Sequence, residues 1–216
     1  NNGKDGIGML KTERRVRVRA ALRAQGLTQM IVCDPKSVWY LTGVAVEPYE
    51  RLLALYLPTE GEPVLFLNRL FNVPEPPCRT VWHTDTDKPV AQIAEVMDAG
   101  RPLGIDKEWP AKFLIPLMET HPGMQVVLSS DCVDDCRACK DAEEQTLMRE
   151  ASRINDAVNE AAKHYIKAGM TEREVAEFID AQFRAHGCEG PSFTTIVSFG
   201  ANAADPHHEP DDTVLK

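Results

Sequence analysis

The chain has 216 residues, of which 43% are hydrophobic, and this is enough to bury one large core or two small ones. Its net charge of −9 excludes a basic surface for nucleic acid or an anionic membrane, so we expect a small or peptidic partner. No apolar run approaches the roughly 20 residues that span a bilayer, and no signal-peptide layout opens the chain, which predicts a cytoplasmic protein.

Residues 9–130 alternate between helical and strand patterns, taking Met9 as the native start. The apolar runs 52–57 and 64–67 flank a Pro-Thr-Glu-Gly-Glu-Pro turn, which predicts an antiparallel hairpin. The remaining patterns predict helices at 10–25, 39–43, 88–99 and around 113–118, and strands at 30–33, 81–82, 103–106 and 125–128. This alternation predicts a complete α/β domain with a mixed sheet.

The pattern changes after residue 140. A capping box of Asp141 and Glu144 opens a long helix to residue 168, and Thr171 with Glu174 opens a second one that ends before Gly187. The stripe expected to face the core of the long helix is Leu147, Ala151, Ile154, Val158, Ala161 and Tyr165. A β-branched run at 193–199 predicts a buried strand that leads into an irregular turn. Because two helices and one strand cannot close a core, this half must be incomplete or lean on another surface.

Six cysteines without an export signal favour free thiols. Cys132, Cys136 and Cys139 have a C-x3-C-x2-C spacing that can hold an iron–sulfur cluster. Residue 138 is Ala rather than an aromatic, and the repeats of a partial barrel do not follow, so we interpret the three as ordinary thiols.

Five patterns in order resemble the prolidases and aminopeptidases P, which are proline-specific pita-bread metallopeptidases, and creatinase shares their fold. The patterns are Asp34 with Tyr40-Leu-Thr-Gly43, Gly104-Ile-Asp106, Arg137-x-x-Lys140 with Glu144 and Met148, Gly169-Met-Thr-Glu-x-Glu-Val175, and Phe193 to His207. The resemblance covers nearly the whole chain from Met9. It implies a creatinase/prolidase-type N-terminal α/β domain at 9–136 and the N-terminal part of an α+β pita-bread domain at 137–216, which would be incomplete.

The resemblance also implies an activity. In that family two Asp, one His and two Glu hold two divalent metals, often Mn²⁺, and these activate a water for attack on the bond before proline. Those ligand segments would follow Lys216, so we expect no metal ligands among these residues and no activity from them alone. The full-length protein would be an Xaa-Pro dipeptidase or aminopeptidase P that acts on proline-containing di- or oligopeptides, as a homodimer.

Three residues are candidates for the site. His207 stands where the family has a histidine that hydrogen-bonds the substrate and the tetrahedral intermediate, so it is the catalytic and substrate-binding candidate. His208 is a further substrate-binding candidate, although adjacent side chains tend to point in different directions. In dimeric relatives the N-terminal domain closes over the neighbouring active site, which makes Arg51 a third one.

Structural rather than functional roles are favoured for the other aromatic, acidic and histidine side chains. Core packing is favoured for Trp39, Tyr40 and Tyr49, and a solvated loop for the acidic residues beside the two histidines. Solvation or a local hydrogen bond at a loop or helix surface is expected for His83, His121, His164 and His186.

Two alternative functions remain open at this point. One is a creatinase-like hydrolase of a non-peptide C–N bond, since fold alone does not decide function. The other is a non-catalytic module that dimerises through its first domain.

Overall fold

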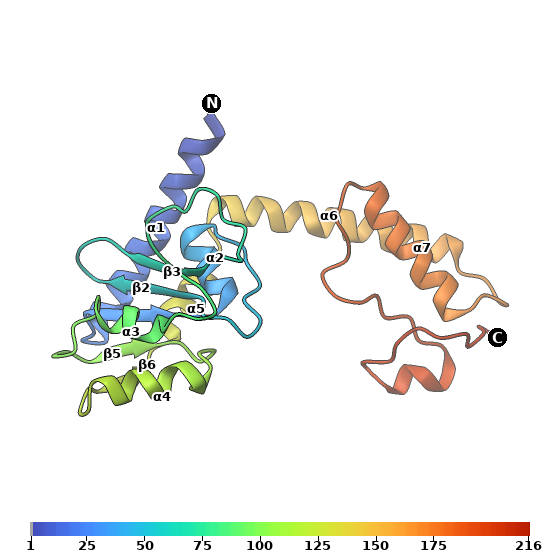
Figure 1. Ribbon diagram of the computed structural model, residues 1–216. Helices are drawn as coiled ribbons and strands as arrows, with labels where there is room; N and C mark the ends of the chain where they lie inside the picture. The colour runs from blue at the N-terminus through green and yellow to red at the C-terminus, as the bar shows by residue number, and fades with distance from the viewer. Residues whose placement is uncertain (1) are drawn as a thin grey trace. The chain divides into compact units, whose positions relative to one another are not determined.

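A computed structural model describes residues 2–216, with side chains from residue 11 onward, and the chain forms two compact units, residues 1–139 and 140–216 (Figure 1). No helix among the described residues is both long enough and apolar enough to cross a membrane.

The first unit is built on a six-stranded sheet with the strand order β4-β3-β2-β1-β5-β6. Its strands are β1 (Gln29–Val32), β2 (Ala54–Pro58), β3 (Val64–Asn68), β4 (Arg79–His83), β5 (Leu103–Ile105) and β6 (Val126–Leu128). β2 pairs antiparallel with β1 and β3, whereas the other neighbours are parallel. The predicted hairpin and mixed sheet are therefore confirmed.

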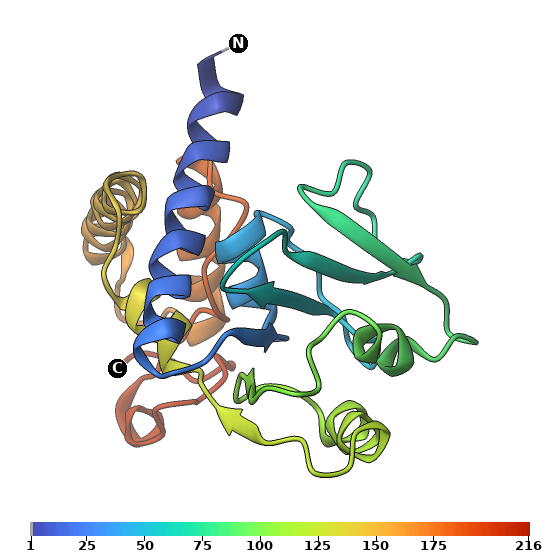
Figure 2. The ribbon, with the colours of Figure 1, turned by 90° about the vertical axis from the view of Figure 1, so that its left-hand side faces the viewer.

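Helices cover both faces of this sheet (Figure 2). One face packs against α1 (Asn2–Ala24), α2 (Pro35–Thr42) and α5 (Asp131–Ala138), and the other against α3 (Pro89–Ala94) and α4 (Ala111–Thr120). Side chains of a strand alternate between faces, so in β2 Leu55 and Leu57 join the first core and Tyr56 the second.

Three residues of the family-like patterns meet at the ends of β1 and β5. Asp106 accepts hydrogen bonds from the backbone amides of Cys33 and Asp34, the latter at 2.8 Å. Asp34 caps α2 by accepting from the amide of Ser37 at 2.9 Å, and it pairs with Arg137 Nη1 at 3.2 Å. These residues therefore hold the strands, α2 and α5 together.

The second unit begins with α6 (Ala142–Tyr165) and α7 (Glu172–Ala185), and both predicted capping boxes are present. The rings of Tyr165 and Phe178 stack with their centroids 3.8 Å apart. Between the helices Gly169 takes a φ of 93°, a conformation that a side chain would strain.

The predicted core stripe of α6 is wrong over its first half, where Leu147 is 63% exposed and Ala151 is also exposed. Val158 is the fully buried member of the stripe. The reason is length: at about 1.5 Å per residue the 14 residues of α7 cover little more than half of the 24-residue α6.

The strand predicted at 193–199 is also absent. Within residues 140–216, all of which are described, strand pairing is limited to one antiparallel bridge between Thr171 and Val214. With no partner strand, the run stays irregular and leaves Phe193 69% and Ile196 42% exposed. They line an open groove of about 710 Å³ beside α6 and α7.

Candidate active-site loop

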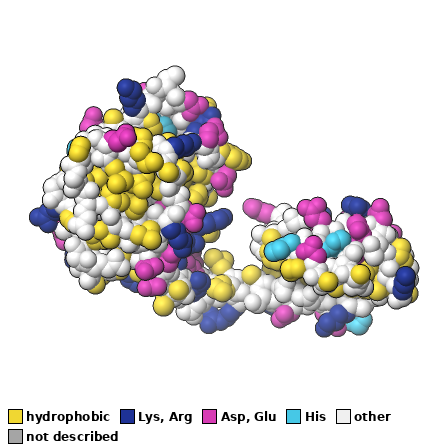
Figure 3. All heavy atoms as spheres, turned by 90° about the horizontal axis from the view of Figure 1, so that it is seen from below, with side chains coloured by type: hydrophobic (Ala, Val, Ile, Leu, Met, Phe, Trp, Pro, Cys, Tyr) yellow, Lys and Arg dark blue, Asp and Glu magenta, His cyan; other side chains and the backbone are white. Residues whose placement is uncertain are grey.

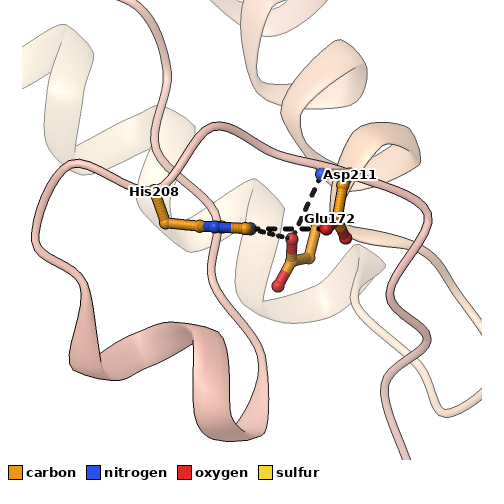
Figure 4. Close-up of side chains that lie close together, drawn as sticks. All are labelled: Glu172, His208 and Asp211. Carbon is orange, nitrogen blue, oxygen red and sulfur yellow. Dashed lines mark hydrogen bonds and ion pairs between the residues drawn. The ribbon is translucent and has the colours of Figure 1, made fainter.

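One buried carboxylate organises the loop of residues 199–213 (Figure 4). Glu172, the first residue of α7, is 0% exposed. Its Oε1 accepts hydrogen bonds from the backbone N–H of Phe199 at 2.6 Å and from Asn202 Nδ2 at 3.0 Å. Its Oε2 accepts from His208 Nε2 at 2.7 Å and from the N–H of Asp211 at 3.2 Å. Each carboxylate oxygen thus has two donors.

These donors decide the charge of Glu172. Burial raises the pKa of its carboxyl group, but the hydrogen bonds from Phe199, His208, Asp211 and Asn202 outweigh burial and lower the pKa to about 2. The carboxylate is therefore ionised at neutral pH, which the N-terminus of a helix also favours.

The ionised carboxylate fixes the protonation of its neighbours. It can only accept hydrogen bonds, so His208 Nε2 must carry a proton. Asn202 Nδ2 lies 3.1 Å from His208 Nε2, and because both nitrogens then carry protons neither donates to the other. Asn202 Nδ2 donates instead to the hydroxyl of Thr213 at 3.1 Å. The amide of Asn202 is thus oriented by Glu172 and Thr213.

Residues 213–215 are hydrogen-bonded to the backbone at the start of α7. The amide of Glu172 donates to the carbonyl of Thr213 at 3.1 Å, and that of Leu215 donates to the carbonyl of Met170 at 2.8 Å. Arg173 pairs with Asp212 at 3.1 Å. The loop is therefore held to one helix end by both backbone and side chains.

The two histidines occupy a tight turn. The carbonyl of Asp205 accepts from the amide of His208 at 3.3 Å, and the Asp205 carboxylate accepts from the amide of His207 at 2.9 Å. Pro206 occupies the second position of this turn, which its fixed φ suits. The His207 side chain is exposed and makes no hydrogen bond to the described part of the chain, whereas the side chain of His208 is only 17% exposed.

Glu172, His208 and Asp211 also form the one group of described side chains whose ligand atoms are close enough to hold a metal, within 4.8 Å. In Figure 3, histidines of the second unit lie beside acidic side chains on the face seen from below. The group does not suit a cation, because four donors use both oxygens of Glu172 and Nε2 of His208 would first have to lose its proton. We therefore interpret it as a hydrogen-bond cluster.

Arg51 lies in the first unit, in an acidic setting. Its Nε and Nη2 donate to the two oxygens of Asp85, both at 2.9 Å, and its Nη1 pairs with Glu50 at 2.7 Å. The guanidinium borders a pocket of about 300 Å³ that Asn68 and His83 also line. Its part in substrate binding stays a prediction.

Several side chains of the first unit differ from expectation. Tyr40 is buried as expected, but Trp39 is 54% and Tyr49 79% exposed, so core packing is wrong for these two. His83 lies on β4 rather than on a surface, is 2% exposed, and its Nε2 contacts the carbonyl of Leu52 at 3.1 Å. A buried imidazole needs such a partner.

The cysteine triplet consists of free thiols, with Cys132 buried, Cys136 half-buried and Cys139 exposed. Burial, followed by the neighbouring Cys136 and aspartates, raises the pKa of Cys132 to about 11. Burial thus keeps Cys132 a protonated, unreactive thiol at neutral pH.

Glu172 stands within the 169–175 pattern, but nothing in the sequence predicts a role for it. A glutamate at the first residue of a helix is common because the helix dipole favours it there. Its partners are 27 to 39 residues away in the sequence, so no local pattern could have revealed them.

Two family descriptions match the chain. Creatinase/Prolidase N-terminal domain matches residues 14–139, and Metallopeptidase family M24 matches residues 146–216.

Solved structures give the same assignment. The dipeptidase PepE from Mycobacterium ulcerans superposes with a TM-score of 0.86 at 28% identity, over 97% of this chain and 58% of that one. A recombinant prolidase from Thermococcus sibiricus gives 0.81 at 26% identity, over 95% and 58%.

An uncharacterized peptidase of Staphylococcus aureus is 30% identical over 196 residues, which are 86% of this chain and 53% of the relative. The chain spans about half the length of the curated relatives it matches. Its mixed-sheet domain and the part that follows match the two family descriptions in order, and the chain therefore belongs to the creatinase/prolidase family of M24 metallopeptidases.

Proposed function

We propose that the whole protein is an Xaa-Pro dipeptidase, a hydrolase that cleaves the peptide bond before proline, with aminopeptidase P as the nearest variant. The observation that carries this is the match over at least 95% of the chain to a dipeptidase and a prolidase, both above 25% identity. Its substrate would be a proline-containing di- or oligopeptide. We also propose a cytoplasmic homodimer.

His207 is the proposed catalytic residue. Its exposed imidazole stands on a turn that is fixed by Asp205 and His208, so it could meet a substrate without first losing a partner. A neutral imidazole N–H can donate a hydrogen bond to the oxyanion that develops at the scissile carbonyl. The proposed substrate-binding roles of His208 and Arg51 would require both to exchange their present partners.

The family is one of metallopeptidases, and we propose two divalent ions, Mn²⁺ first, for the whole protein. Such ions polarise the carbonyl and activate water. The cluster around Glu172 does not fit them, so we place their ligands outside these 216 residues and expect no activity from these residues alone.

The test compares the 216-residue chain with a form extended through the coding sequence downstream of Lys216. Each is assayed with Mn²⁺ on Ala-Pro, on Ala-Ala and on creatine. We expect Ala-Pro hydrolysis by the extended form only. His207→Ala should lower kcat about 100-fold, as loss of an oxyanion donor does, whereas His164→Ala, on the exposed surface of α6, should not.

Preferential turnover of creatine would favour the C–N hydrolase instead. Robust turnover by the 216 residues alone would contradict the placement of the metal ligands.

A further inference from the structure

We propose that Glu172 is a positioning residue, whose carboxylate holds the turn of residues 205–208 in place and so presents His207 to the substrate. This inference rests on the proposed function for the role of His207. The geometry that it claims for Glu172 can be tested without any activity.

The segment between Phe199 and Asp211 has little structure of its own to hold it. The 3-10 helix Gly200–Ala204 is its one regular element. Glu172 binds the amide at each end of the segment, Phe199 at 2.6 Å and Asp211 at 3.2 Å, and a side chain from its middle, Asn202. The hydrogen bonds to this one carboxylate therefore fix the loop in place of regular secondary structure.

The two adjacent histidines then have different tasks. The imidazole of His208 is buried against Glu172 and fixes the last residue of the turn. The carbonyl of Asp205 accepts a hydrogen bond from the backbone amide of His208. This bond fixes the backbone of His207, which lies between Asp205 and His208. Anchoring His208 thus leaves the side chain of His207 exposed in one defined place.

Ionised Glu172 is needed because only a carboxylate has two acceptor oxygens and no donor. In Glu172→Gln, whichever way the amide turns, one pair of donors meets an NH2 group. Glu174 is the matched control, since it lies in the same turn of α7 and contacts Thr171 rather than the loop.

The first experiment measures amide hydrogen exchange by NMR in the 216-residue chain. In Glu172→Gln the amides of Phe199 and Asp211 should exchange about tenfold faster or more, while those of residues 176–185 keep their protection. Glu174→Gln should leave Phe199 and Asp211 unchanged. Asn202→Ala, which removes one donor and keeps the carboxylate, should give an intermediate increase.

Unchanged exchange at Phe199 and Asp211 in Glu172→Gln would overturn the proposal. So would an equal loss of protection throughout α7, because Glu172 would then support the helix rather than the loop.

The second experiment is a double-mutant cycle in the extended form, assayed on Ala-Pro. Glu172→Gln should lower kcat at least tenfold with KM changed less than twofold, and it should have no further effect in the His207→Ala background. Additive losses in kcat would refute action through His207. If no form hydrolyses Ala-Pro, the proposed function fails, while the exchange result still decides whether Glu172 holds the loop.

Discussion

Asp34 both caps α2 and forms an ion pair with Arg137, and two substitutions of this residue can separate the two contributions. It accepts from the amides of Lys36 and Ser37 at the start of α2, and its Oδ2 lies 3.2 Å from Arg137 Nη1. Removing an N-cap costs about 1 kcal/mol, and the partly exposed pair adds about 0.5–1 kcal/mol. Asp34→Ala should therefore destabilise the first unit by about 2 kcal/mol. Asp34→Asn keeps an equally good cap and should cost only about 0.5–1 kcal/mol.

The assay is urea unfolding followed by tryptophan fluorescence. All three tryptophans, Trp39, Trp82 and Trp109, lie in the first unit, so the signal reports this unit alone. With a slope of about 2 kcal/mol per molar urea, the Ala variant should shift the midpoint by about 1 M and the Asn variant by about 0.25–0.5 M. Equal shifts for the two variants would refute the division into cap and charge.

The pH dependence gives a second check on the same residue. Burial raises the pKa of Asp34. The hydrogen bonds from Ser37 and Lys36 and the charge of Arg137 together lower the pKa by more than burial raises it, so the net shift is downward. A depressed folded-state pKa stabilises the fold above the ordinary value of about 3.9, and this contribution is lost as pH falls through the folded value. The gap between wild type and Asp34→Asn should therefore close in acid.

Three further outcomes are expected. Leu55→Ala, at a fully buried position of β2, should cost about 3 kcal/mol in the same urea assay, and Leu70→Ala, 69% exposed, less than about 0.5 kcal/mol; similar costs would contradict the core assignment. With iodoacetamide at pH 7.5, exposed Cys139 should be alkylated at least about 100-fold faster than buried Cys132, whose pKa is raised, and peptide mass analysis would expose a reversed order. Because the folded pKa of Glu172 is depressed to about 2, its stabilisation should be complete above about pH 4.5 and vanish toward pH 2. The stability of the second unit should therefore depend less on pH in this window in Glu172→Gln, as followed by the NMR signals of residues 140–216; an unchanged pH dependence would count against the cluster.

Local signals were enough to predict most of the first unit and the helix starts of the second. The alternation of apolar runs gave the mixed sheet, and the capping boxes gave the starts of α6 and α7. The helix α5 was missed because its sequence, DCVDDCRA, has few apolar residues with which to show a helical period.

What could not be predicted depends on partners that are distant in sequence. A β-branched run becomes a strand only if another strand pairs with it, and residues 193–199 find none in the second unit. The N-terminal half of α6 shows an apolar stripe that α7 is too short to cover. Likewise, the sequence pointed to His207 and His208 together, but only the structure shows Glu172 binding one of them.

Hydrogen bonds within the fold engage several of the residues that carry the family resemblance, but not the side chain of His207, the proposed catalytic residue. Asp34 and Asp106 face inward, and their oxygens accept from backbone amides of the first unit. Glu172 is just as fully used by its loop. A group whose donors or acceptors are all engaged within the fold must give up a bond before it can bind a substrate, at a cost of about 1–3 kcal/mol for each buried group left unpaired. His207 pays no such cost, because its exposed imidazole has no partner among the described residues while its backbone is fixed on both sides.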